Sequence, residues 1–264
     1  MSTTAATTAP ARPPHRWSSL LFGASGVLLV PWIVVLAVVQ PRVAPVGDVA
    51  LAAGGAMTAT TVGLLVSAAL TVTRSPYLVM TSSATATVAL CTGFFHVVSG
   101  TASNPRAAAF GTLLVVGPVA VLCVLVARHG TRPRTPSTDR LLALLFVLGA
   151  VATVLAWARA ASAGFDAQYA HHLKLAWVGL DVAEAAVLLT TAAALRWYPA
   201  RVPPAAAASG ALLCCDVWFN VVGAVGEARA NAIQMTFVSI PLAVVAFVVG
   251  VREVRHLDDG GPGR

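Results

Sequence analysis

Charged residues are scarce in this chain. Only 10% of its 264 residues are Asp, Glu, Lys or Arg, whereas 58% are hydrophobic, and the mean hydropathy is +0.81. A soluble globular domain usually carries about 25% charged residues. The composition therefore excludes an ordinary water-soluble enzyme or binding domain and predicts an integral membrane protein.

Lysine and cysteine are also rare. Lys174 is the single lysine among 17 basic residues, and the arginines lie between apolar segments instead of forming one basic patch. We therefore exclude nucleic acid as a partner and expect the basic ends to lie against anionic lipid head groups. All four cysteines fall within apolar segments, where a thiol packs as a small hydrophobic group. We expect no disulfide, no metal site and no cofactor.

Long apolar segments are abundant, and eight of them can each cross a membrane as a helix. A helix needs roughly 17 to 25 apolar residues to span the hydrocarbon core. The segments lie at 20–39, 49–73, 77–99, 108–127, 141–160, 175–195, 205–226 and 232–250. We therefore predict an all-α polytopic bundle of about eight transmembrane helices. Residues 1–19, rich in Thr, Ala and Pro, are expected to form a disordered cytoplasmic tail.

The distribution of basic residues predicts the orientation of the spans. If the N-terminus is cytoplasmic, 12 of the 17 basic residues fall in cytoplasmic segments. The five on the opposite side are Arg42, Arg106, Arg159, Lys174 and Arg229. Cytoplasmic segments carry an excess of Arg and Lys, so we predict that both termini face the cytoplasm of a bacterium, with the chain in its plasma membrane.

The chain divides into two halves at its longest basic connection. We expect a first four-helix half at 20–128, a cytoplasmic linker at 129–140, a second four-helix half at 141–251 and a cytoplasmic tail at 252–264. Because each half has four spans, the two would have the same orientation in the membrane. That arrangement predicts a parallel repeat.

Sequence similarity between the halves supports this expectation. An offset of 124 residues aligns Cys91 with Cys215 and Phe95 with Phe219. Over residues 64–128, 14 of the 65 residues are identical to the residue 124 positions later. About half that number is expected by chance for such a composition.

Three carboxylic acids lie deep within the apolar segments of the second half: Asp181, Glu184 and Asp216. A charged side chain at the centre of a bilayer costs about 2.5 to 3.5 kcal/mol, so acids kept there usually face the bundle interior and mark a functional site. Asn220 follows Asp216 by one helical turn on the same face. We predict that these four residues form a binding site for a proton, a cation or a polar substrate.

Five further residues are accessory candidates, because they extend the same helix faces or lie near the same depth. They are Lys174, Trp177, Trp218, Glu227 and His96. Glu227 would continue the stripe that begins at Asp216 toward the outer end of its helix. Under the 124-residue offset, the acids correspond to uncharged residues, so we expect the first half to act as scaffold.

Short motifs in the second half suggest a resemblance. The segment from Trp177 to Asp181 reads WVGLD, the segment from Asp216 to Asn220 reads DVWFN, and Pro31 precedes Trp32 in the first span. These motifs resemble short signatures of a group of multi-spanning actinobacterial membrane proteins with no assigned activity. The resemblance covers mainly the last three spans and implies no reaction. In that group an acid is common at the position of Asn220, so the amide here departs from the pattern and argues against a two-carboxylate pair on this helix.

Three classes of function are open. The leading hypothesis is a small transporter or carrier whose carboxylates bind a proton or cation. The alternative is an intramembrane enzyme acting on a lipid or isoprenoid, in which a buried acid donates a proton as in integral membrane terpene cyclases. No catalytic motif supports an enzyme, however. The third class is a non-catalytic membrane subunit, in which the acids would form hydrogen bonds between helices. The expected partners are the bilayer and a small cation or lipid-like substrate, and the residues predict no oligomeric state.

Overall fold

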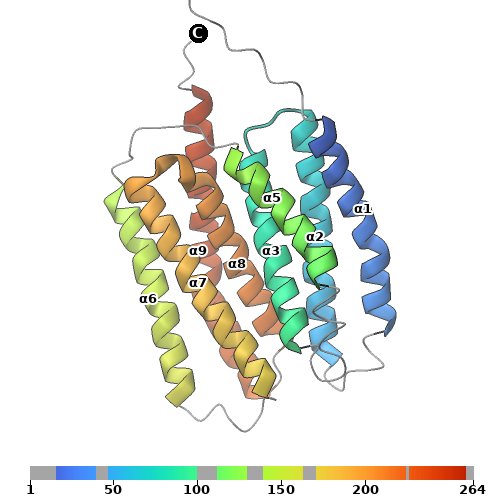
Figure 1. Ribbon diagram of the computed structural model, residues 1–264. Helices are drawn as coiled ribbons and strands as arrows, with labels where there is room; N and C mark the ends of the chain where they lie inside the picture. Colours follow the sequence, from blue (N-terminus) through green and yellow to red (C-terminus); the bar gives the residue numbers. More distant parts are fainter. Residues whose placement is uncertain are drawn as a thin grey trace, which may run out of the picture.

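The described chain is an antiparallel bundle of α-helices (Figure 1). The computed structural model describes residues 16–39, 47–99, 112–129, 139–162, 171–223 and 226–259. Residues 1–15 of the expected N-terminal tail, residues 130–138 of the linker and the last five residues lie outside these ranges, whereas residues 16–19 of the expected tail belong to the first turn of α1 (Arg16–Val39). No strand occurs within them.

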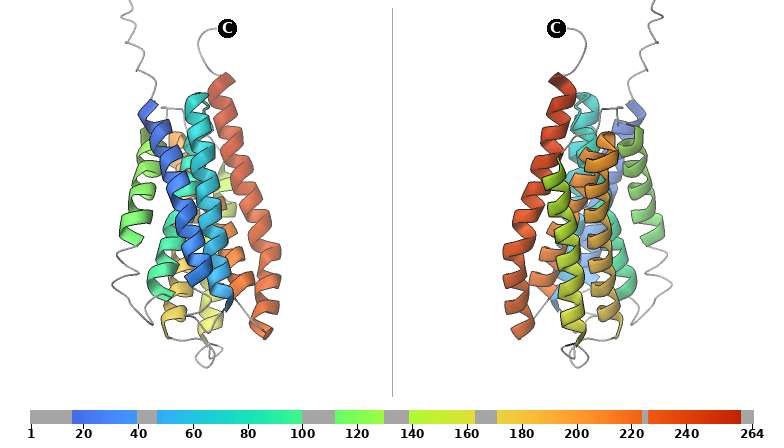
Figure 2. Two further views of the ribbon diagram at one scale, coloured as in Figure 1. Left: turned by 90° about the vertical axis from the view of Figure 1, so that its right-hand side faces the viewer. Right: turned by 90° about the vertical axis from the view of Figure 1, so that its left-hand side faces the viewer.

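Eight helical segments form the bundle, which agrees with the predicted all-α class. Their bounds are α1 (Arg16–Val39), α2 (Gly47–Val72), α3 (Leu78–Ser99), α5 (Gly117–His129) preceded by the π-helical turn η3 (Thr112–Val116), α6 (Arg140–Ser162), α7 (His171–Trp197), α8 (Val202–Gly223) preceded by the short 3-10 turn η5 (Pro199–Arg201), and α9 (Gly226–Asp259). Consecutive helices run in opposite directions, so α1 begins and α9 ends at the same end of the bundle (Figures 1 and 2).

Five of the described helices contain segments long and apolar enough to cross a membrane. These segments are Leu51–Val72, Leu78–Val98, Trp177–Trp197, Pro199–Val222 and Ala232–Arg255. Shorter apolar stretches lie at Trp17–Pro31, Thr112–Arg128 and Arg140–Leu155. Large hydrophobic side chains such as Leu28, Leu141 and Phe237 point outward. A surface with many exposed large apolar side chains is typical of a protein region that contacts a membrane or another protein.

Helix α8 lies at the centre of the bundle and packs against α9, α3, α7 and α2. Its contact with α3 includes the side chains of Phe219 and Phe95, whose rings are stacked. At the other end of the same contact, the Ser83 hydroxyl on α3 donates a hydrogen bond of 2.7 Å to the Pro204 carbonyl on α8. The position of α8 matters because it carries one of the predicted acids and brings it next to α7.

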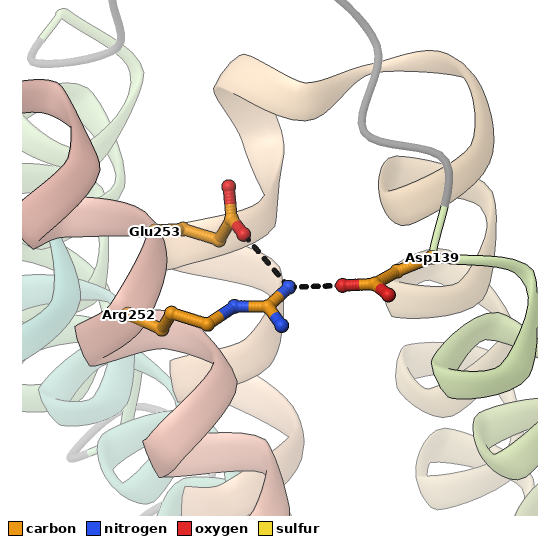
Figure 3. Close-up of polar contacts among 3 residues, drawn as sticks. All are labelled: Asp139, Arg252 and Glu253. Atoms are coloured by element: carbon orange, nitrogen blue, oxygen red, sulfur yellow. Dashed lines mark hydrogen bonds and ion pairs between the residues drawn. The ribbon is translucent and has the colours of Figure 1, made fainter. Parts of the chain in front are cut away.

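The end of α9 differs from the prediction. Hydropathy places the end of this span at residue 250, but the helix continues to Asp259. Arg252 there contacts both Asp139, at the start of α6, and the neighbouring Glu253 (Figure 3). Arg, Glu and Leu are all good helix formers, so the helix continues beyond the end of the apolar segment.

Exposed arginines gather at the end of the bundle where α1 begins and α9 ends. Arg74 lies in the turn between α2 and α3, Arg140 starts α6, and Arg196 and Arg201 flank the turn between α7 and α8. Helices α1, α3, α6 and α8 end at the opposite end of the bundle (Figure 1).

Candidate functional site

Glu184 lies at the middle of α7 and is 5% exposed. Its carboxyl group receives a hydrogen bond from the Thr153 hydroxyl of α6, with 2.7 Å between Thr153 Oγ1 and Glu184 Oε1. The same hydroxyl lies 3.2 Å from the carbonyl oxygen of Gly149, one turn earlier on α6. Thr153 did not emerge from the sequence, because a threonine in an apolar span usually bonds only to its own helix.

Asp216 lies on α8 and is 8% exposed. The side-chain amide of Asn220 donates a hydrogen bond of 2.6 Å to Asp216 Oδ1. The i, i+4 spacing of the two residues places them on one face of α8. An uncharged amide therefore neighbours this acid on its own helix.

Asp181 completes the cluster, one turn before Glu184 on α7. Asp216 is close enough to interact electrostatically with both Glu184 and Asp181, and Asp181 interacts in the same way with Glu184. Asp181 is partly buried and forms no hydrogen bond with any residue that the structure describes. Three acids from the adjacent helices α7 and α8 thus lie within electrostatic range of one another.

No described cation neutralises this cluster. Among the side chains that the structure describes, the resolved ion pairs are those of Arg252, at the arginine-bearing end of the bundle. Within the same residues, no group of three or more His, Cys, Asp or Glu side chains is arranged to hold a metal ion. The cluster is therefore a concentration of acid groups whose charge is not offset by a described Arg or Lys.

Three aromatic side chains pack beside the acids. Phe95 of α3 stacks on Phe219 of α8, and Trp177 of α7 meets the edge of Phe95 with 5.3 Å between ring centroids. Phe219 lies one turn beyond Asp216, and Trp177 lies one turn before Asp181. The rings belong to one apolar cluster, in which Phe95 and Phe219 are buried and Trp177 is partly buried.

The accessory candidates are placed in different ways. Trp177 packs beside the site, whereas Trp218 turns toward α2, where its indole N–H donates to the Ala52 carbonyl at 2.9 Å. His96 is half-buried on α3. The side chain of Lys174 on α7 lies outside the described residues.

The predicted stripe from Asp216 to Glu227 is wrong as a single helix face. Helix α8 ends at Gly223, and Glu227 belongs to the first turn of α9. Glycine commonly ends a helix, so the two glycines that flank the break, Gly223 and Gly226, are the signal that hydropathy alone missed. The side chain of Glu227 lies outside the described residues.

The fold defines the class of this chain as an all-helical protein whose described helices include five long and apolar enough to cross a membrane, which is consistent with a membrane protein. Comparison of the chain with family models, curated proteins and solved structures gave no match. The likeness to the actinobacterial group therefore stays a prediction, and function is inferred from the geometry of this chain.

Proposed function

We propose that the chain is a membrane carrier that binds and releases a proton or a small cation at Asp181, Glu184 and Asp216, with Asn220 as an uncharged neighbour. The observation that carries this proposal is the convergence of three acids in the bundle without a described cationic partner. Carboxylic acids that face one another inside a membrane bundle are typical of proton and ion pathways.

The hydrogen bonds of Thr153 favour a proton as the ligand. A threonine hydroxyl has one proton and can also accept. When Glu184 is ionised, Thr153 donates to Oε1, as its 2.7 Å contact allows. When Glu184 is protonated, the acid can donate to Thr153, which then donates to the Gly149 carbonyl at 3.2 Å. Both protonation states of Glu184 keep a hydrogen bond without movement of heavy atoms.

Proton flux into proteoliposomes tests the proposal directly. We expect flux down an imposed pH or potential gradient in the wild-type protein, and at least tenfold less in Glu184→Gln and Asp216→Asn. The matched controls are Thr60→Val and Thr92→Val, because both threonines are buried at the equivalent positions of the first half. Wild-type flux no greater than that of empty liposomes, for protons and for sodium or potassium ions, would refute the carrier.

The finer architecture that we propose is two related halves, α1 to α5 and α6 to α9. Two glycine contacts support it. The ring of Trp218 on α8 lies against Gly55 on α2, and the ring of Phe94 on α3 lies against Gly179 on α7. The two contacts are equivalent under the 124-residue offset, because Gly55 corresponds to Gly179 and Phe94 corresponds to Trp218.

Buried side chains in the two halves support the same relationship. Phe22 and Leu64 are fully buried in one cluster, and Phe146 and Leu188, each 124 residues later, are fully buried in another. Between the two halves, α2 contacts α8 and α3 contacts α7. These contacts are equivalent, because the same offset relates α2 to α7 and α3 to α8. Equivalent residues meet where a two-fold axis passes, and the stacking of Phe95 on its equivalent Phe219 fits an axis between α3 and α8.

We propose further that the arginine-bearing end faces the cytoplasm of a bacterial cell, with both termini on that side. The exposed Arg74, Arg140, Arg196 and Arg201 support this orientation, because basic residues concentrate on the cytoplasmic side of membrane proteins. Single-cysteine labelling with a membrane-impermeant maleimide tests it, with Arg74→Cys and Arg196→Cys in a cysteine-free background. Labelling of either position in intact cells would contradict the orientation.

An intramembrane enzyme acting on a lipid or isoprenoid is the second candidate. The aromatic rings of Phe95, Trp177 and Phe219 favour it, because they gather beside the acids in a chain that is only 7% aromatic. A protonated acid next to aromatic faces could start and stabilise a carbocation. Lipid extracts of cells that express the wild type or Asp216→Asn would differ in an isoprenoid product if this candidate is right.

A further inference from the structure

The interface between α7 and α8 is layered from the acids toward the arginine-bearing end. Thr191 follows Glu184 by seven residues on α7, and Ser209 precedes Asp216 by seven residues on α8. Seven residues correspond to about two turns, or roughly 10 Å. Because the helices are antiparallel, the two hydroxyls meet at the same level, with 2.8 Å between their oxygens. Both side chains are fully buried.

The direction of the hydrogen bonds in this pair follows from the number of protons. Ser209 Oγ donates to the Val187 carbonyl at 3.1 Å. A hydroxyl has only one proton, so Thr191 is the donor in its bond with Ser209. The oxygen of Thr191 is therefore the accepting end of a short chain that runs from Thr191 through Ser209.

One apolar layer separates the hydroxyl pair from the acids. Leu188 of α7 and Leu213 of α8 each lie about one turn from both polar layers, and they are 0% and 1% exposed. Closely packed leucines exclude water, and apolar constrictions of this kind gate membrane pathways. The leucine layer thus separates the acids from the hydroxyl pair, and Leu195 and Val202 form a further buried apolar layer between the pair and the arginine-bearing end.

The first half lacks this hydroxyl pair. Ser67 and Thr85 occupy the equivalent positions and are buried. Thr85 donates to the Thr81 carbonyl of its own helix, and the Ser67 hydroxyl has no hydrogen-bond partner. At these equivalent positions, the two hydroxyls are therefore joined across helices in the half that carries the acids and are not joined in the other.

We propose that Thr191 and Ser209 form the next proton-transfer station of the carrier, and that Leu188 and Leu213 are the gate between this station and the acids. The proposal rests on the proposed function and specifies its path. When water enters the leucine layer, a carboxylic acid gives its proton to water, and water gives one to Thr191. Each hydroxyl accepts one proton and releases its own to the next oxygen. The last proton passes to water that enters the buried layer of Leu195 and Val202 from the arginine-bearing end. One O–H bond breaks and one forms at every step.

Hydroxyl removal tests the station. Thr191→Val keeps the shape of the side chain, and Ser209→Ala removes one oxygen. We expect each variant to slow proton flux in proteoliposomes at least threefold, while the acid C=O bands in the infrared spectrum keep their wild-type pH dependence. The matched first-half variants, Ser67→Ala and Thr85→Val, should stay within twofold of wild type.

Leucine truncation tests the gate. We expect Leu188→Ala to raise proton leak severalfold, because water then crosses the layer more often. Leu64→Ala is the matched control, since Leu64 is equally buried at the equivalent position of α2. If Leu188→Ala unfolds in detergent, the volume-conserving Leu188→Met and the isosteric Thr191→Val still decide the question. For Leu188→Met, the expected result is a leak that differs from that of Leu64→Met.

Two outcomes separate the proposals. Equal flux changes in both halves, or none in either, while Asp216→Asn still abolishes flux, would overturn the station and the gate but leave the carrier. Absence of proton flux in the wild type would overturn both proposals.

Discussion

The rings of Phe95 and Phe219 lie face to face, with centroids 4.2 Å apart and planes 8° from parallel. Phe95 comes from α3 and Phe219 from α8, so this stack joins the proposed halves at their contact. Both rings are nearly fully buried, at 3% and 2% exposure. The stack also lies one turn from Asp216, so its packing positions α8 at the acid site.

We expect Phe95→Ala and Phe219→Ala each to lower the free energy of unfolding by about 3 to 5 kcal/mol. The double variant should lose less than the sum, by about 0.5 to 1.5 kcal/mol, because the rings stack on each other. Thermal or denaturant unfolding in detergent measures these values. Phe237→Ala is the control, because that ring is 77% exposed on α9. Strict additivity would show that the rings do not interact.

Two glycines are expected to be intolerant of a methyl group. A Cβ at Gly55 would lie under 3.0 Å from the Trp218 ring, and a Cβ at Gly179 would lie under 3.0 Å from the Phe94 ring. Gly55→Ala and Gly179→Ala should therefore destabilise the fold by about 1 to 3 kcal/mol, because the rings must move.

The neighbouring Gly54 supplies the control. A Cβ there meets nothing within 4 Å, so Gly54→Ala should be neutral or stabilising by up to about 1 kcal/mol. Melting temperatures of the three variants in one detergent decide the comparison. Equal destabilisation of Gly54→Ala and Gly55→Ala would contradict the close ring contact.

Arg252 is expected to hold α9 against the start of α6. Arg252→Gln removes the charged contacts with Asp139 and with the buried Glu253, and should lower the free energy of unfolding by about 1 to 3 kcal/mol. Asp139→Asn should cost less than about 1 kcal/mol, because the Asp139 side chain is 41% exposed. Chemical unfolding in detergent measures both, and a larger loss for Asp139→Asn would reverse this assignment.

Thr153→Val should alter the Glu184 carboxyl group without unfolding the bundle. The variant keeps the side-chain shape but removes the donor to Glu184 Oε1. We expect the C=O band of protonated Glu184 to move in the infrared difference spectrum, and proton flux to fall at least threefold. Thr190→Val is the control, because Thr190 is exposed and bonds only to the Ala186 carbonyl of its own helix. Identical spectra for wild type and Thr153→Val would contradict a hydrogen bond between Thr153 and Glu184 in both protonation states of the acid.

The apolar segments were sufficient to predict the helices, because lipid forces the backbone to satisfy its hydrogen bonds within each span. They were insufficient at helix ends. At residue 250 the hydropathy falls but α9 continues to Asp259, and between Gly223 and Gly226 one predicted polar stripe is divided between two helices. Hydropathy records where lipid lies, whereas helix ends depend on local caps and charges.

The acids could be singled out because a carboxyl group is rare in an apolar span, and the structure brings Asp181, Glu184 and Asp216 together. Their neighbours could not be singled out in the same way. Thr153 and Phe95 are ordinary residues for a membrane helix, and their importance follows from contacts with residues far away in the chain. Trp218 shows the converse, because it is close to Asp216 in sequence yet packs on α2.

The Phe95 and Phe219 stack has an evolutionary consequence under the proposed repeat. A chain that ended after one half would present the α3 or α8 face to a second copy of itself, and identical phenylalanines would meet across a homodimer. Such a dimer built from residues 139–259 alone would hold two acid clusters, one per subunit, where the present chain has one. Gene duplication and fusion would then have let one copy lose its carboxylates while continuing to support the other.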